Sequence, residues 1–146
     1  MGVTFLKRIL SLAAALKSTG AGEMIASTVI GLLGENPSPL LLTFVVFIIC
    51  AVLTNFMSNT ATTALMAPIC LAIAQGMGAD PRAVLMACVI GGSCAYATPI
   101  GMPANTMVVG AGNYKFIDYV KSGLPLIVIA TVISMIILPI AFPFYP

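Results

Sequence analysis

The chain has 146 residues, of which 60% are hydrophobic and only 7% are charged, with a mean hydropathy of +1.14. Soluble domains carry about 25% charged residues, so this composition excludes an ordinary soluble domain and indicates an integral membrane protein. The net charge of +2 comes without a basic stripe, which argues against nucleic-acid binding. The chain has no histidine and no CxxC pair, which argues against an enzyme and against a metal or redox site built from histidine and cysteine.

The first 36 residues read as a leading helix at 3–19 and a short interfacial helix at 23–34. Gly20 and Gly22 end the leading helix, and polar residues follow one side of the interfacial helix. Glycine and two prolines between residues 34 and 39 then form a turn that starts the next helix. We expect residues 1–146 to form one membrane domain, with 40–126 carrying the functional site.

Residues 40–75 are predicted to form a helical hairpin. Its first arm, 40–56, is strongly apolar, and a polar run at 54–63 separates it from a second arm at 64–74. The second arm has about 11 fully apolar residues, or about 16 Å of helix, against a hydrocarbon core about 30 Å thick. This shortness favours a re-entrant hairpin with its tip near mid-membrane, although two full spans joined by a surface loop stay possible.

The remainder of the chain reads as a broken transmembrane helix at about 82–111 and a terminal transmembrane helix at about 123–144. The break lies around Thr98-Pro99 and Pro103, and the connection at 112–122 carries Lys115 and Lys121. The positive-inside rule places this connection in the cytoplasm and the C-terminus outside. We therefore expect a multi-pass protein of the plasma membrane.

Two interrupted helices at membrane depth are costly unless the interruptions line a cavity or bind something. Carbonyl groups at the end of a half-helix favour cations, and N–H groups at a helix start favour anions. The carbonyls of 54–57, with the side chains of Ser58, Asn59 and Thr60, could coordinate Na⁺. The N–H groups of Ala61 and Thr62 would face a carboxylate or sulfate. The second break offers carbonyls at 96–97 and N–H groups near residue 104. Alternatively, such polar residues only bond neighbouring helices together.

Two long motifs resemble the signatures of the divalent anion/sodium symporter family of secondary transporters. One is MSNTATTALMAPI at 57–69, which is similar to the family's Ser-Asn-Thr hairpin tip. The other is ATPIGMPANTMVVGAGNYKFIDYVKSGLPL at 97–126, which is similar to its unwound helix and following connection. The resemblance implies an all-α membrane protein, specifically half of an inverted-repeat transporter fold with a re-entrant hairpin. It also implies sodium-driven transport of a dicarboxylate, citrate or sulfate by a homodimer.

The resemblance also implies residue roles. It assigns substrate binding to the following residues: Ser58, Asn59, Thr60, Thr98 and Pro99. It assigns sodium binding to these: Thr54, Met57, Asn59 and Ala97.

The resemblance covers only the family's C-terminal repeat, so the chain would hold half of a substrate site. It would then be a fragment, a subunit that needs a separate first-half chain, or one member of an antiparallel homo-oligomer. A non-transporting small membrane subunit is the main alternative. Transport of another solute, such as arsenite or a proton-exchanged cation, is a further one. Proton exchange is disfavoured because no carboxylate falls inside the apolar segments.

Overall fold

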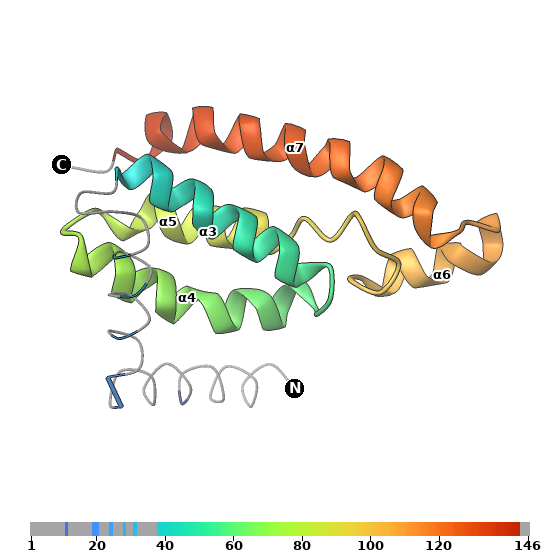
Figure 1. The fold of residues 1–146 in the computed structure, drawn as a ribbon, viewed down its shortest axis with the longest axis horizontal. Coiled ribbons are helices and arrows are strands. Elements are labelled where there is room, and N and C mark those ends of the chain that lie inside the picture. Colours follow the sequence, from blue (N-terminus) through green and yellow to red (C-terminus); the bar gives the residue numbers. More distant parts are fainter. Residues whose placement is uncertain are drawn as a thin grey trace.

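In the computed structural model (Figure 1), the described residues are 38–143 and six isolated earlier positions, at 11, 19, 20, 24, 28 and 31. Apart from those positions, the helices predicted at 3–19 and 23–34 lie outside the described residues and stay predictions. Within 38–143 the chain folds into five α-helices and no strand, which confirms the all-α prediction for this part. The helices are α3 (Pro39–Thr54), α4 (Asn59–Gly76), α5 (Pro81–Gly91), α6 (Pro103–Gly112) and α7 (Phe116–Ala141).

The predicted helical hairpin is present as α3 and α4, which contact each other and are joined by only four residues. Ser38 starts α3, because its side chain accepts a hydrogen bond from the backbone N–H of Leu41 and Pro39 follows at the first helical position. The second arm is longer than predicted, since α4 has 18 residues and includes the polar positions 59–63. At about 24 and 27 Å, both arms fall slightly short of the hydrocarbon core, and re-entrance stays a prediction.

The core of the described chain lies where α3, α4 and α5 meet. Each of these helices contributes one fully buried cysteine, at positions 50, 70 and 88, within a cluster of aliphatic side chains. A second apolar cluster around Phe47 and Leu138 joins α3 and α5 to α7. Figure 1 shows the result: α3, α4 and α5 run side by side, and α7 lies along α3 and α5. Small thiols suit this three-helix crossing because they let the backbones approach closely.

The helix predicted to begin after Asp80-Pro81 does so, but it ends earlier than expected. Asp80 is the N-cap of α5, and its carboxylate accepts from the Arg82 backbone N–H at 2.9 Å. The helix then stops at Gly91, so the prediction that it continues to the break at Thr98-Pro99 is wrong, because 92–97 is not helical. Glycine at positions 91 and 92 explains the difference, because glycine is a poor helix former.

The Asp80–Arg82 pair predicts a pH dependence of stability. The Arg82 guanidinium donates to the Asp80 carboxylate at 2.6 Å, and these hydrogen bonds hold the pKa of that carboxyl below its ordinary value. A carboxyl with a lowered folded-state pKa contributes stability above its unfolded pKa of about 3.9, and this contribution is lost as the pH falls through the folded pKa. In thermal unfolding, Asp80→Asn should therefore melt slightly below the wild type at neutral pH, and the difference should vanish in acid. Asparagine is an equally good N-cap. A difference in melting temperature that stays the same at every pH would therefore contradict the role of the Asp80 charge.

The last helix is also longer than the sequence indicated. The connection predicted at 112–122 becomes helical from Phe116, where the Asp118 carboxylate in the first turn accepts from the Lys115 backbone N–H at 2.8 Å. Among the described helices, α7 is the one long and apolar enough to cross a membrane. Most of its large apolar side chains are exposed, as expected of a helix that faces lipid or another protein segment.

Helix α6 stands apart from the other helices. None of its residues is buried, and Figure 1 shows it beyond the hairpin tip, next to the start of α7. An irregular segment, 92–102, connects it to α5. The predicted interruption is therefore present, as a long irregular segment between two short helices, and their forming one transmembrane crossing stays a prediction.

Candidate functional site

The hairpin tip is organised by a serine cap. Ser58 has extended backbone angles and is the N-cap of α4, and its Oγ accepts from the backbone N–H of Ala61 at 3.2 Å. The N–H of Thr62 donates to the Ser58 carbonyl at 2.9 Å. The prediction that Ala61 and Thr62 present free N–H groups is therefore wrong. Since α4 begins at Asn59, the first-turn N–H groups without an intrahelical acceptor are those of Asn59 and Thr60.

Three oxygen atoms from three parts of the chain converge beside this tip. The Thr54 side chain at the end of α3 is fully buried, and its Oγ1 lies 2.7 Å from Asn59 Oδ1 at the start of α4. The same Oγ1 lies 2.7 Å from the carbonyl oxygen of Gly92, just after α5. A hydroxyl has one proton, so it can satisfy only one of these two acceptors. Such a group of partly unsatisfied hydroxyl, amide and carbonyl oxygens is what a hard cation prefers.

Glycine residues allow these segments to approach each other. A Cβ atom at Gly92 would lie 2.8 Å from the Thr63 hydroxyl oxygen, and one at Gly101 would lie 2.8 Å from the Thr54 carbonyl oxygen. At Gly91, a Cβ would lie 2.6 Å from the Phe47 carbonyl oxygen. The irregular segment can therefore lie directly against the hairpin because it lacks side chains at the contact positions.

Asn55 ties the hairpin tip to the irregular segment. The side chain is 5% exposed, and its Oδ1 accepts from the backbone N–H of Ala97 at 2.9 Å. Its Nδ2 donates to the Ala51 carbonyl at 2.6 Å and, at 3.3 Å, to the Cys94 carbonyl. The Asn55 carbonyl accepts from the hydroxyl of Thr98. One residue thus connects the end of α3 to three positions of the irregular segment.

Helix α6 holds the opposite side of the same segment. Asn105 Nδ2 donates to the carbonyls of Ala95, at 2.8 Å, and Thr98, at 3.0 Å. The Thr106 hydroxyl donates to the Pro99 carbonyl at 2.6 Å. The backbone carbonyls of an unwound segment need such donors when water is scarce. The side chains of Asn105 and Thr106, in the first turn of α6, therefore stabilise the irregular segment.

The structure brings some of the predicted site residues together but leaves others apart. Thr54 and Asn59 meet directly, and the Ser58 and Thr60 side chains are exposed at the tip. Ala97 and Thr98 are buried, with the Ala97 N–H and the Thr98 hydroxyl proton directed at Asn55, while Pro99 is half-buried. Met57 is half-buried, and its N–H donates to the Leu53 carbonyl. Sequence reasoning did not single out the Gly92 carbonyl, because a backbone oxygen has no residue-type signal. It also did not single out Asn55 within the polar run, because the sequence does not show which distant residues its amide contacts.

The Thr62 hydroxyl is a further group that sequence reasoning did not assign to the site, since only the backbone N–H of Thr62 was predicted to face an anion. Its side chain is fully buried near Gly92, and its hydroxyl has no hydrogen-bond partner among the described residues. Buried hydroxyls without partners are costly, by about 1–3 kcal/mol. The Thr62 side chain lies next to Gly92, whose carbonyl belongs to the oxygen cluster, so an unpartnered hydroxyl here is consistent with a ligand site nearby.

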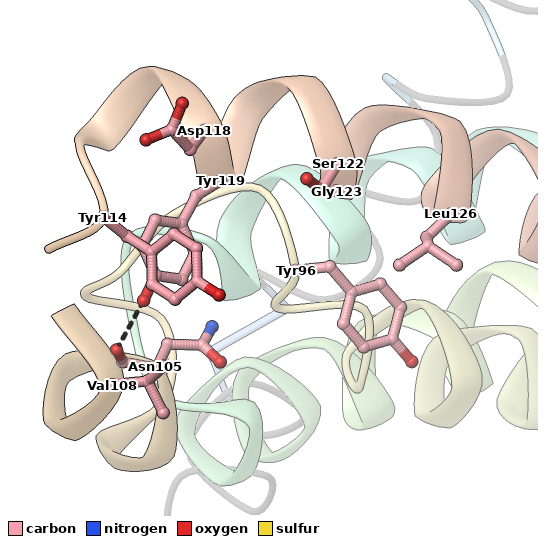
Figure 2. A pocket seen from close by; sticks show the side chains of 9 residues that line it. All are labelled: Tyr96, Asn105, Val108, Tyr114, Asp118, Tyr119, Ser122, Gly123 and Leu126. Carbon is pink, nitrogen blue, oxygen red and sulfur yellow. Dashed lines mark hydrogen bonds between the residues drawn. The ribbon is translucent and has the colours of Figure 1, made fainter. Parts of the chain in front are cut away.

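A pocket of about 280 Å³ lies elsewhere, between the irregular segment, α6 and the start of α7 (Figure 2). Tyr96, Asn105, Tyr114 and Tyr119 line it, and the hydroxyl of Tyr119 donates to the Asn105 carbonyl at 2.8 Å. None of the predicted substrate or sodium residues lines this pocket. The oxygen cluster at the tip, and not this pocket, is therefore the candidate site.

Comparison with known proteins gives a consistent family. Residues 5–145 match the family model described as citrate transporter. The chain is 41% identical over 134 residues to the uncharacterized transporter YfbS of Escherichia coli, an alignment covering 90% of this chain and 22% of YfbS. It is 32% identical over 114 residues to the Na(+)/citrate cotransporter of Rattus norvegicus, covering 78% of this chain and 20% of that protein. An uncharacterized transporter of Synechocystis matches 99% of this chain at 31% identity, across 23% of its own length.

The chain thus spans about a fifth of the length of these curated relatives. The family model covers almost all of this chain. All three relatives are named as transporters, which agrees with the family that the motifs at 57–69 and 97–126 indicate. The resemblance indicated by those motifs is confirmed: the chain belongs to the citrate transporter family, whose relatives here include sodium/citrate cotransporters.

Proposed function

We propose that this chain forms half of the site of a sodium-coupled transporter for a divalent anion, with citrate, a dicarboxylate or sulfate as the candidate substrates. The observation that carries the proposal is the convergence of Thr54 Oγ1, Asn59 Oδ1 and the Gly92 carbonyl oxygen at the hairpin tip. The names of sodium/citrate cotransporters among the relatives support the same ion and the same class of substrate.

Sodium would bind among the oxygens at the end of α3. Thr54 and Asn59 supply side-chain oxygens, and the carbonyls of Met57 and Ala97 are the predicted additional ligands. The Gly92 carbonyl lies 2.7 Å from Thr54 Oγ1 and therefore joins this set as a candidate. The C-terminal end of α3 also carries partial negative charge from the helix dipole, which stabilises a cation there. A hard cation of this kind takes about six oxygens, so the second half of the site would complete the coordination.

The anion would bind on the other side of the same tip. Ser58, Asn59 and Thr60 lie at the N-terminus of α4, where the helix dipole and the free N–H groups favour negative charge. Helix α6 begins at Pro103 without a side-chain cap, and Gly101 lies close to the Thr54 carbonyl. The start of α6 would therefore be a second helix N-terminus close to the cation site, and Thr98 and Pro99, in the segment leading into it, stay the predicted substrate residues.

A complete site needs more protein than this chain. Because the chain spans about a fifth of its relatives, the missing half would come from further sequence, from a separate first-half chain or from a second copy in a homo-oligomer. We place the assembly in the plasma membrane, with the 112–122 connection in the cytoplasm and the C-terminus outside, as the loop charges indicate.

The test is the cation dependence of uptake by the complete assembly. Vesicles containing it should accumulate radiolabelled citrate, succinate or sulfate in a sodium gradient, and the rate should fall at least about tenfold when potassium or choline replaces sodium. Empty vesicles give the background, and a sodium ionophore should abolish accumulation by collapsing the gradient. Uptake of all three anions at equal rates with and without sodium would contradict the proposal.

A second candidate is a non-transporting membrane subunit. It is favoured by the hydrogen bonds of Asn55, Thr98 and Asn105, all of which join segments of this chain. In that case the polar residues would only hold helices together. The same vesicles would then show no accumulation of any of the three anions.

A further inference from the structure

We infer that Asn55 is a positioning residue, which holds the irregular segment against the hairpin tip so that ion-binding oxygens from both meet. The inference rests on the proposed function and adds to it a residue outside the predicted ligand set. It starts from the position of Asn55, directly after Thr54 at the end of α3 and 5% exposed.

Both polar atoms of the Asn55 side chain form hydrogen bonds. Its Oδ1 accepts from the Ala97 N–H at 2.9 Å, while its Nδ2 donates to the carbonyls of Ala51, at 2.6 Å, and Cys94, at 3.3 Å. The bond to Ala51 lies within α3 and orients the amide. The bonds to Cys94 and Ala97 then reach across to the irregular segment, so the orientation of the amide sets the position of that segment.

The backbone of Asn55 extends the connection. Its carbonyl accepts from the Thr98 hydroxyl, and that hydroxyl in turn accepts from the Gly101 N–H at 3.2 Å. Thr98 is thereby held in one rotamer between the hairpin and the turn that leads into α6. Gly101 can approach the hairpin because it has no Cβ; a Cβ there would collide with the Thr54 carbonyl. Asn55 thus anchors Cys94, Ala97 and Thr98 directly, and Gly101 through Thr98, on the hairpin side of the irregular segment.

This anchor differs from buried polar side chains that bond only within their own helix. Thr43 and Thr131 are also buried, but each donates to a carbonyl four residues earlier in its own helix. Such bonds satisfy a hydroxyl without fixing another segment. Asn55 instead couples the two interruptions, whose oxygens must stay at the right separation for a cation to fit between them. Loss of its amide would also leave the Ala97 N–H unpaired, whereas the Cys94 carbonyl would keep its bond from the Tyr96 N–H.

The experiment uses the complete membrane assembly with Asn55→Leu, which removes both amide functions at similar volume. Two quantities are measured: the sodium concentration that gives half-maximal citrate uptake, corrected for the amount of protein in the membrane, and amide hydrogen exchange of the peptide containing 92–101. The expected result is at least a tenfold rise in half-saturating sodium, together with faster exchange in that peptide. Thr43→Val, which removes a buried hydroxyl at the other end of α3, should change neither quantity.

A second variant keeps the test decisive if Asn55→Leu fails to fold. Asn55→Asp retains an oxygen for the Ala97 N–H and, when protonated, an O–H for the Ala51 carbonyl. The sodium concentration that half-saturates uptake by this variant is compared with that of the wild type at each pH. The two values should therefore approach each other as the pH is lowered. A purely structural role would lower the protein amount without moving the sodium dependence.

The outcomes separate the two hypotheses. Unchanged sodium dependence in the Asn55 variants, with the wild type sodium-dependent, would overturn the inference and leave the proposed function intact. Unchanged exchange at 92–101 would overturn it as well. A wild type that takes up citrate without any need for sodium would overturn the proposed function itself.

Discussion

Asn59→Ala is expected to remove most sodium-driven uptake at sodium concentrations that half-saturate the wild type. The substitution removes the Oδ1 atom that lies 2.7 Å from Thr54 Oγ1, and with it one of the three oxygens that converge at the tip. A polar contact to a charged group contributes about 1.5–3 kcal/mol, which corresponds to a loss of sodium affinity of about tenfold to a hundredfold. Titration of citrate uptake against sodium concentration, with the protein amount quantified, measures the effect directly.

Two further variants make the Asn59 result specific. Gln75→Ala removes an exposed amide at the opposite end of the same helix and should leave sodium dependence unchanged. Asn59→Asp keeps an oxygen toward Thr54 but adds a negative charge beside the anion-binding helix start. It should retain sodium binding better than alanine while losing citrate affinity. If Asn59→Ala transports as well as Gln75→Ala, the oxygen cluster is not the sodium site.

Gly123→Ala is expected to displace the irregular segment and to destabilise the protein. Gly123 is buried in α7, and a Cβ there would collide with the backbone of Tyr96 and Ala97. Backbone atoms cannot rotate away as a side chain can, so either α7 or the segment must shift. Overpacking of this kind costs about 1–3 kcal/mol. Thermal unfolding of the purified protein in detergent should show a clear decrease in melting temperature.

Gly110→Ala is the matched control for this prediction. It lies in helix α6, and a Cβ at that position would meet nothing within 4 Å. Since alanine is the better helix former by about 0.5–1 kcal/mol, the melting temperature should stay the same or rise. Equal stability of the two alanine variants would show that α7 does not pack against the irregular segment as described.

The limits of sequence reasoning are clearest at the ends of the helices. The starts of α3 and α5 follow from Ser38-Pro39 and Asp80-Pro81, whose capping chemistry is local. The end of α5 was predicted six residues too late, because apolar residues continue beyond Gly91 and only packing against α3 and α4 shows that the chain has unwound. The start of α7 was placed too late because charged residues before the apolar run read as a loop, whereas Asp118 accepts from the Lys115 N–H in the first turn of the helix.

The amino-acid sequence by itself determined the membrane class, the hairpin, the interrupted helix and the family, because composition, apolar run length and the two long motifs are properties of contiguous residues. It also indicated Thr54 and Asn59, since polar residues between apolar arms are conspicuous. Only the tertiary structure decided that the Gly92 carbonyl joins them and that Asn55 holds the two interruptions together. Those relations depend on backbone atoms that lie about forty residues along the chain from their side-chain partners. Nearly every residue has the same backbone carbonyl and N–H groups, so the residue types in the sequence do not show which of them take part.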